Sequence, residues 1–245
     1  MEKLARMCYI LSMGRRFFLV RIILAVLIFS VFALPAGAQG FLSRISWLVD
    51  GSVLFFPEDN GTESDPMPVL PSLGFGASCQ ITKISKMNLA LELTLDFYYT
   101  HYGYSDNLER AIPQAIENRS SLVIGSVLAV QAAFSFDLTQ LMTLRAFIGP
   151  AADLRIVVLA EKLTQGLDDI SAIRAEVDLV RKYFWSQGRW LLPVMGTGLD
   201  FTLNSRFKLG LDFRVWMPMY RLWTGEDLPA IEGWRFGIGF RLTIR

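Results

Sequence analysis

The residues best suited to catalysis lie in the stretch YYTHYGYSD. It holds His101, the only histidine of the chain, and Ser105 and Asp106 follow within five positions. A serine nucleophile needs a base such as histidine within hydrogen-bond reach, so these three residues would suit acyl transfer. Their spacing matches no catalytic motif, however, and a single histidine near the end of an apolar strand is usually an interfacial residue. We therefore expect no enzyme and assign no catalytic residue.

Metal and redox chemistry has little support in the sequence. The chain has two cysteines, Cys8 and Cys79, and Cys8 falls within the leader predicted below. A single remaining cysteine can form neither an internal disulfide nor a CxxC motif. The glycine-containing stretches GFGAS and GIGF precede no helical pattern and do not indicate phosphate loops. The sequence predicts no metal site and no cofactor.

Isolated charges in apolar surroundings are a second group of chemically important residues. Those expected on the polar face of their strands, in the half of the fold nearer the short turns, are Asp50, Glu92, Arg145, Asp200, Asp212 and Arg241. A buried charge is costly unless it is paired, so we expect a salt-bridge network. In this network Arg241 would reach Asp50 on one side and Asp212 on the other. It would close the lower part of the interior. The plainer interpretation is that these charges only satisfy one another inside a narrow barrel, and the other alternative is a gated ion path.

The elements that must hold these charges are strands with two different faces. In WRFGIGFRLTIR, residues 234–245, every second residue is apolar and the others are only glycine, threonine or arginine. A strand places these two sets on opposite faces. The same alternation recurs in about eight segments: 45–56, 73–81, 88–102, 121–134, 142–156, 191–203, 207–220 and 234–245.

The connections between these segments alternate in length. Long polar loops alternate with short turns along the chain. The long loops are expected at 57–69, 103–118, 159–188 and 221–233, and the short turns at 82–88, 137–140 and 204–206. This alternation is typical of an up-and-down barrel whose two rims face different compartments. We therefore predict an all-β fold, an eight-stranded antiparallel transmembrane β-barrel.

The 159–188 loop carries a helical pattern. Its apolar residues recur at spacings of three and four, at Ile170, Ile173, Val177, Val180 and Phe184. Asp168 and Asp169 lie where a helix start favours acids, and Arg181 and Lys182 lie where its end favours bases. We expect one short helix that orders an extracellular loop; the alternative is a lid over the barrel mouth.

The composition of the polar face decides which solvent each face meets. That face is mostly glycine, alanine, tyrosine and threonine with single charges of both signs, which suits a narrow interior better than a surface in water. The apolar face is continuous and would be an aggregation liability in water. Aromatic residues gather near the strand ends, as membrane interfaces favour. The apolar face is therefore expected to meet lipid.

The N-terminal residues 1–38 resemble a secretory leader. Arg15, Arg16 and Arg21 come first, then an apolar core from 22 to 34, then the small-residue site Ala36-Gly37-Ala38. The alternative is an uncleaved inner-membrane anchor. Removal would leave residues 39–245 as one barrel domain with 19 basic and 22 acidic residues, because the leader holds five bases and one acid. This balance favours no nucleic-acid partner.

In these patterns the chain resembles the small eight-stranded outer-membrane barrels of diderm bacteria, the OmpA, OmpX and OmpW group. The resemblance covers nearly all of residues 39–245 and lies in the strand pattern. It implies outer-membrane lipid around the barrel and an assembly machinery that reads the last strand. Members often end on an aromatic residue, whereas this chain ends Ile244-Arg245 with Phe240 further in, so that signal is partial. The stretch IGPAADLRI is similar in style to spirochaete barrels. Some barrels of this type act on lipid A with His and Ser, but no motif carries that activity over.

A set of large side chains would gather near the outer mouth, on the polar face: Tyr98, Trp190, Leu192, Trp216 and Tyr220. A polar interior does not need two tryptophans, so we expect a pocket for a small apolar ligand, similar to the hydrophobic lumen of the OmpW type. The alternative is that these side chains cork the barrel.

Together these patterns predict an outer-membrane protein, porin-like or OmpW-like, that passes or binds a small apolar or polar solute. The alternative function is a closed structural barrel whose extracellular loops bind host or envelope partners.

Overall fold

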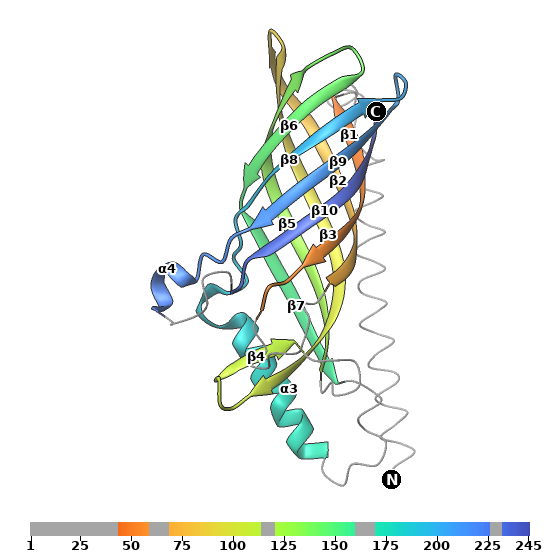
Figure 1. Ribbon diagram of the computed structural model, residues 1–245. Helices are drawn as coiled ribbons and strands as arrows, with labels where there is room; N and C mark the ends of the chain where they lie inside the picture. The colour runs from red at the N-terminus through yellow and green to blue at the C-terminus, as the bar shows by residue number, and fades with distance from the viewer. Residues whose placement is uncertain (1–43, 59–68, 114–120, 160–169, 226–231) are drawn as a thin grey trace, which may run out of the picture. The chain divides into compact units, whose positions relative to one another are not determined.

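The computed structural model describes residues 44–58, 69–113, 121–159, 170–225 and 232–245 (Figure 1). The chain divides into two units, Met1–Arg44 and Ile45–Arg245, and the description below concerns the second. The predicted leader lies outside the described residues, so its removal stays an expectation. Within the described residues, no helix is long and apolar enough to cross a membrane.

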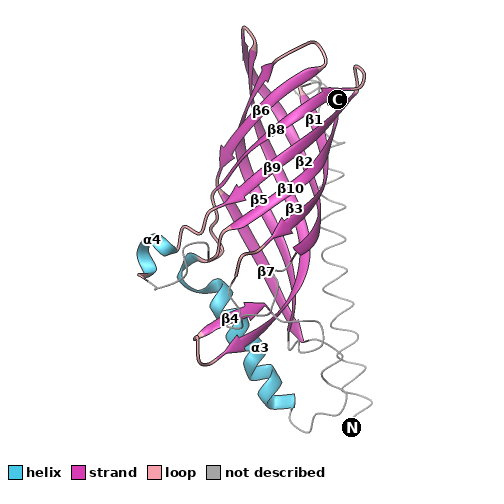
Figure 2. Ribbon diagram, in the orientation of Figure 1, coloured by secondary structure: helices cyan, strands magenta, loops and turns pink. Residues whose placement is uncertain are grey.

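The second unit is built around one antiparallel sheet. Its strands, in chain order, are β1 (Ile45–Phe55), β2 (Val69–Ile84), β3 (Met87–Ser105), β4 (Arg110–Pro113), β5 (Ser121–Asp137), β6 (Met142–Gly149), β7 (Ala151–Leu159), β8 (Val194–Thr202), β9 (Phe207–Trp216) and β10 (Arg235–Ile244). The order in the sheet is β4-β3-β2-β1-β10-β9-β8-β6-β5-β7, with β3 also paired to β5. The β3–β5 pairing closes the sheet into a barrel (Figure 2).

The ring of the barrel has eight strand positions because β6 and β7 together occupy one of them, each covering half of its length. Both strands pair with β5. Strand β6 pairs with the part of β5 from Ala132 toward the short turn, and β7 pairs with the part from Ala129 toward the long loop. Pro150 separates them, and a proline cannot donate to the ladder. Strand β4 pairs only with the end of β3 and stands outside the closed ring. The predicted fold class, an eight-stranded antiparallel barrel, is confirmed.

Several strands differ in length from the sequence prediction. Strand β2 runs from 69 to 84, where 73–81 was expected, and a bulge between Gln80 and Thr82 breaks its alternation. Strands β8 and β9 are shorter than expected, since Pro193 precedes the first and Pro218 follows the second. Proline has no N–H to donate to the ladder, which explains why the strands end near these positions.

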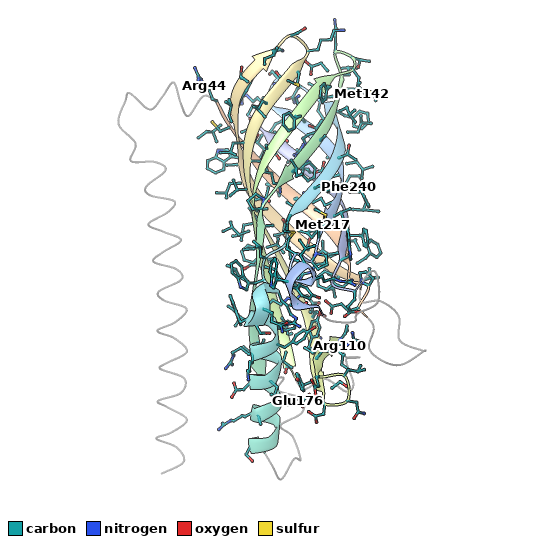
Figure 3. All side chains as sticks on the ribbon, turned by 90° about the vertical axis from the view of Figure 1, so that its left-hand side faces the viewer. Arg44, Arg110, Met142, Glu176, Met217 and Phe240 are labelled. Atoms are coloured by element: carbon teal, nitrogen blue, oxygen red, sulfur yellow. The ribbon has the colours of Figure 1, made fainter. Side chains whose placement is uncertain are left out.

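The two faces of the strands meet different surroundings, as the alternation predicted. On β3, the outward-facing Leu93 and Phe97 are 50% and 44% exposed. The preceding residues Glu92 and Asp96 face inward and are 4% and 3% exposed. Outward-facing side chains surround the barrel, Phe240 among them (Figure 3). Closure pairs the backbone groups of the ring internally, which lipid requires of a spanning sheet. The apolar outer face is therefore the lipid face.

One end of the barrel carries β4 and the described helices, and the other carries the short turns (Figure 1). The helix α3 (Ile170–Trp185) contacts β3, β4 and β7. Val177, Val180 and Phe184 are buried as the spacing predicted. The side chains of Ile170 and Ile173, and the residues Asp168 and Asp169, lie outside what the structure describes. A 3-10 turn, η4 (Ser186–Gly188), follows α3, and a short helix, α4 (Arg221–Thr224), follows β9.

Candidate functional site

Asp212 lies at the centre of a charge network in the half of the barrel near the short turns. Its Oδ2 accepts a hydrogen bond from Arg145 Nη2 at 2.5 Å and from Arg214 Nη2 at 3.4 Å. The Nε of Arg241 lies 3.7 Å from the same oxygen. One carboxylate thus faces three guanidinium groups, which β6, β9 and β10 contribute.

Two acids from other strands extend this network. Glu92, on β3, accepts from Arg145 Nη1 at 2.5 Å and from Arg241 Nη1 at 3.4 Å. Asp200, on β8, accepts from Arg241 Nη2 at 2.8 and 3.0 Å. The structure therefore brings five of the six predicted network residues into direct contact with one another.

The sixth, Asp50, has a partner that was not predicted. Arg214 Nη2 donates to Asp50 Oδ2, and Arg214 Nη1 donates to Asp96 Oδ1 at 3.2 Å. The expected pair between Arg241 and Asp50 is therefore wrong. The position of Arg214 and Asp96 on the inward face was visible in the alternation, but the reach of the arginine across β10 was not.

The network leaves little free space. The cavity beside it has a volume of about 10 Å³ and is lined by Leu48, Asp50, Phe75, Glu92, Thr94, Asp96, Gln131, Arg145, Arg214 and Arg241. This volume is at the lower limit of what holds one water molecule.

An apolar plug fills the interior next to the network. The Arg145 guanidinium lies 4.4 Å from the centroid of the Phe147 ring, which begins the plug. The buried residues of this cluster, which we call the plug, are Leu54, Phe56, Tyr98, Val127, Ala129, Ala133, Phe147, Ala151, Leu192, Val194 and Trp216.

The predicted aromatic set divides between the plug and the mouth. Tyr98, Leu192 and Trp216 belong to the plug. Trp190 is 38% exposed, and with Leu192 and Tyr220 it lines a cavity of about 30 Å³ at the end with the long loops. The ligand-binding role of these five residues stays a prediction.

A second charge cluster lies between the plug and this mouth cavity. Asp153 accepts hydrogen bonds from Tyr98 Oη at 2.8 Å and from Arg155 Nε at 2.6 Å, and Arg235 Nη2 lies 2.7 Å from its Oδ2. All four side chains are buried. Asp153, Arg155 and Arg235 were not predicted as site residues from the sequence, although the alternation places them on the inward face.

Aromatic rings and arginines alternate at the mouth. The Arg189 guanidinium lies 4.2 Å from the centroid of the Tyr183 ring and 5.0 Å from that of Tyr220, within cation–π range. Burial raises the pKa of the Tyr183 phenol, and Arg189 partly opposes this rise. Burial also raises the pKa of Tyr220, with nearby Tyr183 and Glu58 adding to the rise. Both phenols therefore stay neutral under ordinary conditions.

The structure does not assemble the His101, Ser105 and Asp106 trio. His101 and Ser105 both belong to β3, and four residues of an extended strand span about 13 Å. The Ser105 hydroxyl accepts a long hydrogen bond from the Leu108 amide at 3.4 Å. Among the described residues, no group of three or more His, Cys, Asp or Glu side chains could hold a metal ion. Nothing in this geometry supports catalysis.

Strand number, closure and an apolar exterior define a small eight-stranded barrel of the bacterial outer membrane. In barrels of this class the short turns face the periplasm and the long loops face outward, and this is the orientation expected here. The resemblance noted from the sequence is borne out at the level of the fold, whereas a spirochaete type stays a prediction.

The sequence matches no known protein-family profile. It also matches no curated protein sequence. Its structure is similar to that of Neisserial surface protein A, with a TM-score of 0.45, 10% identity, and coverage of 82% of this chain and 96% of the other. OprG from Pseudomonas aeruginosa gives a TM-score of 0.43, 9% identity and coverage of 82% and 96%. For Ail from Yersinia pestis, in complex with the heparin analogue sucrose octasulfate, the TM-score is 0.39 and the identity is 9%, with coverage of 82% of this chain and 94% of the other.

Proposed function

We propose that this protein is a closed outer-membrane barrel that holds a folded module at the cell surface and acts through that module. The observation that carries the proposal is the filled interior. From the short-turn end outward, the barrel contains the Asp212 network, then the plug, then the cluster around Asp153. The cavity beside the Asp212 network has a volume of only about 10 Å³, and the cavity of about 30 Å³ lies at the outer end, beside Asp153, Leu192 and Arg235.

The outer part of the chain supports the second half of the proposal because an apolar core packs α3 and β4 against the outer ends of β3, β5 and β7. Tyr102, Ala111, Val123, Val157, Val177, Val180 and Phe184 form this core, and we call residues 102–113 and 170–188 the surface module. The Tyr104 amide donates to Glu176 Oε1 at 3.0 Å, which ties β3 to α3. Arg110 and Glu176 lie in this same part of the protein (Figure 3). An ordered module of this kind is suited to contact a host or envelope partner.

The porin-like function expected from the sequence needs a continuous path, and the packing of the interior argues against one. Binding of a small solute at the outer mouth is compatible with the packing, and it is the second candidate function. The cavity lined by Trp190, Leu192 and Tyr220 favours it.

Conductance of refolded residues 39–245 in planar bilayers tests the closed state. The folded barrel, recognised by heat-modifiable mobility on gels, should give no discrete channels, while a known porin in the same bilayer confirms that the recording works. Discrete channels of reproducible size from the folded barrel would overturn the proposal and restore a porin-like role.

Labelling of intact cells tests the surface position of the module. In a Cys79→Ser background, Leu179→Cys on the exposed face of α3 should react with a membrane-impermeant maleimide. The matched variant Lys86→Cys, in the turn between β2 and β3, should react only after the cells are opened. The reverse pattern would place the module in the periplasm.

A further inference from the structure

The mouth cavity contains a buried arginine with unused hydrogen-bond donors. Arg235 is 4% exposed and lines the cavity, and its guanidinium lies 4.7 Å from the centroid of the Phe56 ring. Its Nη2 faces Asp153 at 2.7 Å. Its Nε and Nη1 have no hydrogen-bond partner among the described residues. A buried donor without an acceptor carries the full desolvation penalty, so this arginine favours an added acceptor.

A third unused donor lies next to it in the sheet. Trp216 is the register partner of Arg235 on β9, and its Nε1 is also buried without a hydrogen-bond partner. The side of the barrel where β9 and β10 meet the mouth is therefore rich in donors and short of acceptors.

The acids around the cavity are engaged by other residues. Asp153 faces two arginines, Arg155 and Arg235, and also accepts from Tyr98. One carboxylate cannot neutralise two guanidinium groups, so this buried cluster carries one positive charge in excess.

Two other acids line the cavity, and their charges enter the balance. Glu58 accepts the Tyr102 hydroxyl at 2.5 Å, and Glu232 pairs with Arg110 at 3.4 Å. Among the described residues, the cavity wall, which includes Arg189, and its direct partner Arg110 hold four arginines and three acids. The balance again leaves one positive charge.

We propose that the mouth cavity binds the carboxylate group of a small organic monoanion, with Arg235 as the main contact. A single negative charge matches the single excess positive charge. A volume of about 30 Å³ is enough for a carboxylate group. The apolar remainder of the ligand would extend over Trp190, which is half-exposed at the rim of the cavity. This site deepens the second candidate function and does not depend on whether the barrel conducts.

The test is titration of the refolded barrel, in a detergent without carboxylate or phosphate groups, with benzoate by isothermal calorimetry. Acetate, benzyl alcohol and inorganic phosphate are titrated as comparison probes. Benzoate should bind, acetate should bind more weakly because it lacks the aromatic part, and benzyl alcohol and phosphate should bind at least tenfold more weakly than benzoate. Equal binding of benzyl alcohol would overturn the proposal in favour of an apolar solute site, and preferred binding of phosphate would also overturn it.

Variants separate the contacts. Arg235→Gln should weaken benzoate binding at least tenfold, whereas Arg206→Gln, at the exposed periplasmic rim, should leave it unchanged. Trp190→Ala should weaken benzoate binding while leaving acetate unaffected, which keeps the test decisive if Arg235→Gln fails to fold. A folded Arg235→Gln that binds benzoate as well as the wild type would refute the role of Arg235. Failure of every carboxylate to bind the folded wild type would end the proposal without touching the closed state, which conductance tests separately.

Discussion

Arg145 and Asp212 join two strands that are not neighbours. Arg145 lies on β6 and Asp212 on β9, with β8 between them, and the Nη2 to Oδ2 distance is 2.5 Å. Both side chains are at most 3% exposed. The pair therefore spans β8 on the inner side of the barrel and links two strands that share no backbone hydrogen bonds.

Loss of one partner from this network should destabilise the barrel strongly. Arg145→Met would leave Glu92 without its 2.5 Å partner and Asp212 with fewer cations. Breaking a buried pair in this way costs about 3–5 kcal/mol of unfolding free energy. The measurement is urea unfolding of the wild-type and Arg145→Met barrels in lipid vesicles, which gives the difference in unfolding free energy.

The matched control is the exposed pair between Lys83 and Asp137, whose Nζ and Oδ2 are 3.8 Å apart. Lys83→Met should change the unfolding free energy by less than about 1 kcal/mol, since exposed pairs contribute little. A similar small loss for Arg145→Met would show that the network is not structural.

The alternation of the sequence predicted which charges face inward, but it could not predict how they pair. Asp50 and Arg241 are register partners on β1 and β10, which made them look like a salt bridge. In the structure Arg241 extends toward Asp200 instead, and Arg214 reaches Asp50 from β9, across β10. Long side chains in a narrow interior choose among several acids within reach. Strand order alone does not fix that choice.

Tyr98 packs over Gly125 inside the barrel, and this contact gives a second prediction. A Cβ at position 125 would overlap the Tyr98 ring, and the bonds from Tyr98 Oη to Asp153 hold that ring in place. Gly125→Ala should therefore cost about 1–3 kcal/mol through overpacking.

Gly51 provides the matched control for that substitution. It lies on the outer face of β1, and a Cβ there would meet no atom within 4 Å. Gly51→Ala should leave the unfolding free energy within about 0.5 kcal/mol of the wild type. Equal effects of the two substitutions would contradict the packing of Tyr98 on Gly125.

The surface module should be able to open without unfolding the barrel. Val180 is fully buried in the module core, whereas its neighbour Leu179 is 40% exposed. Val180→Ala should destabilise the module by roughly 1–3 kcal/mol. Trypsin cleavage after the exposed Arg181 and Lys182 should rise about tenfold, because cleavage follows the population of the open form.

The same digestion supplies its own controls. Leu179→Ala should be cut at the wild-type rate, and the heat-modifiable mobility of both variants should match that of the wild-type barrel. Loss of that mobility in Val180→Ala would mean that module and barrel form one cooperative unit.

The mouth cluster shows another limit of sequence-based prediction. Tyr98, Asp153 and Arg235 come from β3, β7 and β10, and each was placed on the inward face by alternation. The contacts among these side chains depend on the tilt of the strands and on Pro150, which lies between β6 and β7. Trp190 was expected beside Trp216, but it lies before β8 begins, where period two no longer applies.

The tyrosines at the mouth give a prediction for alkaline pH. Tyr220 is 5% exposed, and burial raises the pKa of its phenol above the ordinary value near 10. A raised pKa in the fold means that folding favours the neutral phenol. The stability that Tyr220 contributes is therefore fully present below about pH 10 and is lost as pH rises through the folded pKa. The difference in absorbance at 295 nm between wild type and Tyr220→Phe should show one ionisation at higher pH in the folded barrel than in the urea-unfolded chain. Coincident steps in the two states would mean that the Tyr220 phenol is open to water and that the mouth is not packed as described.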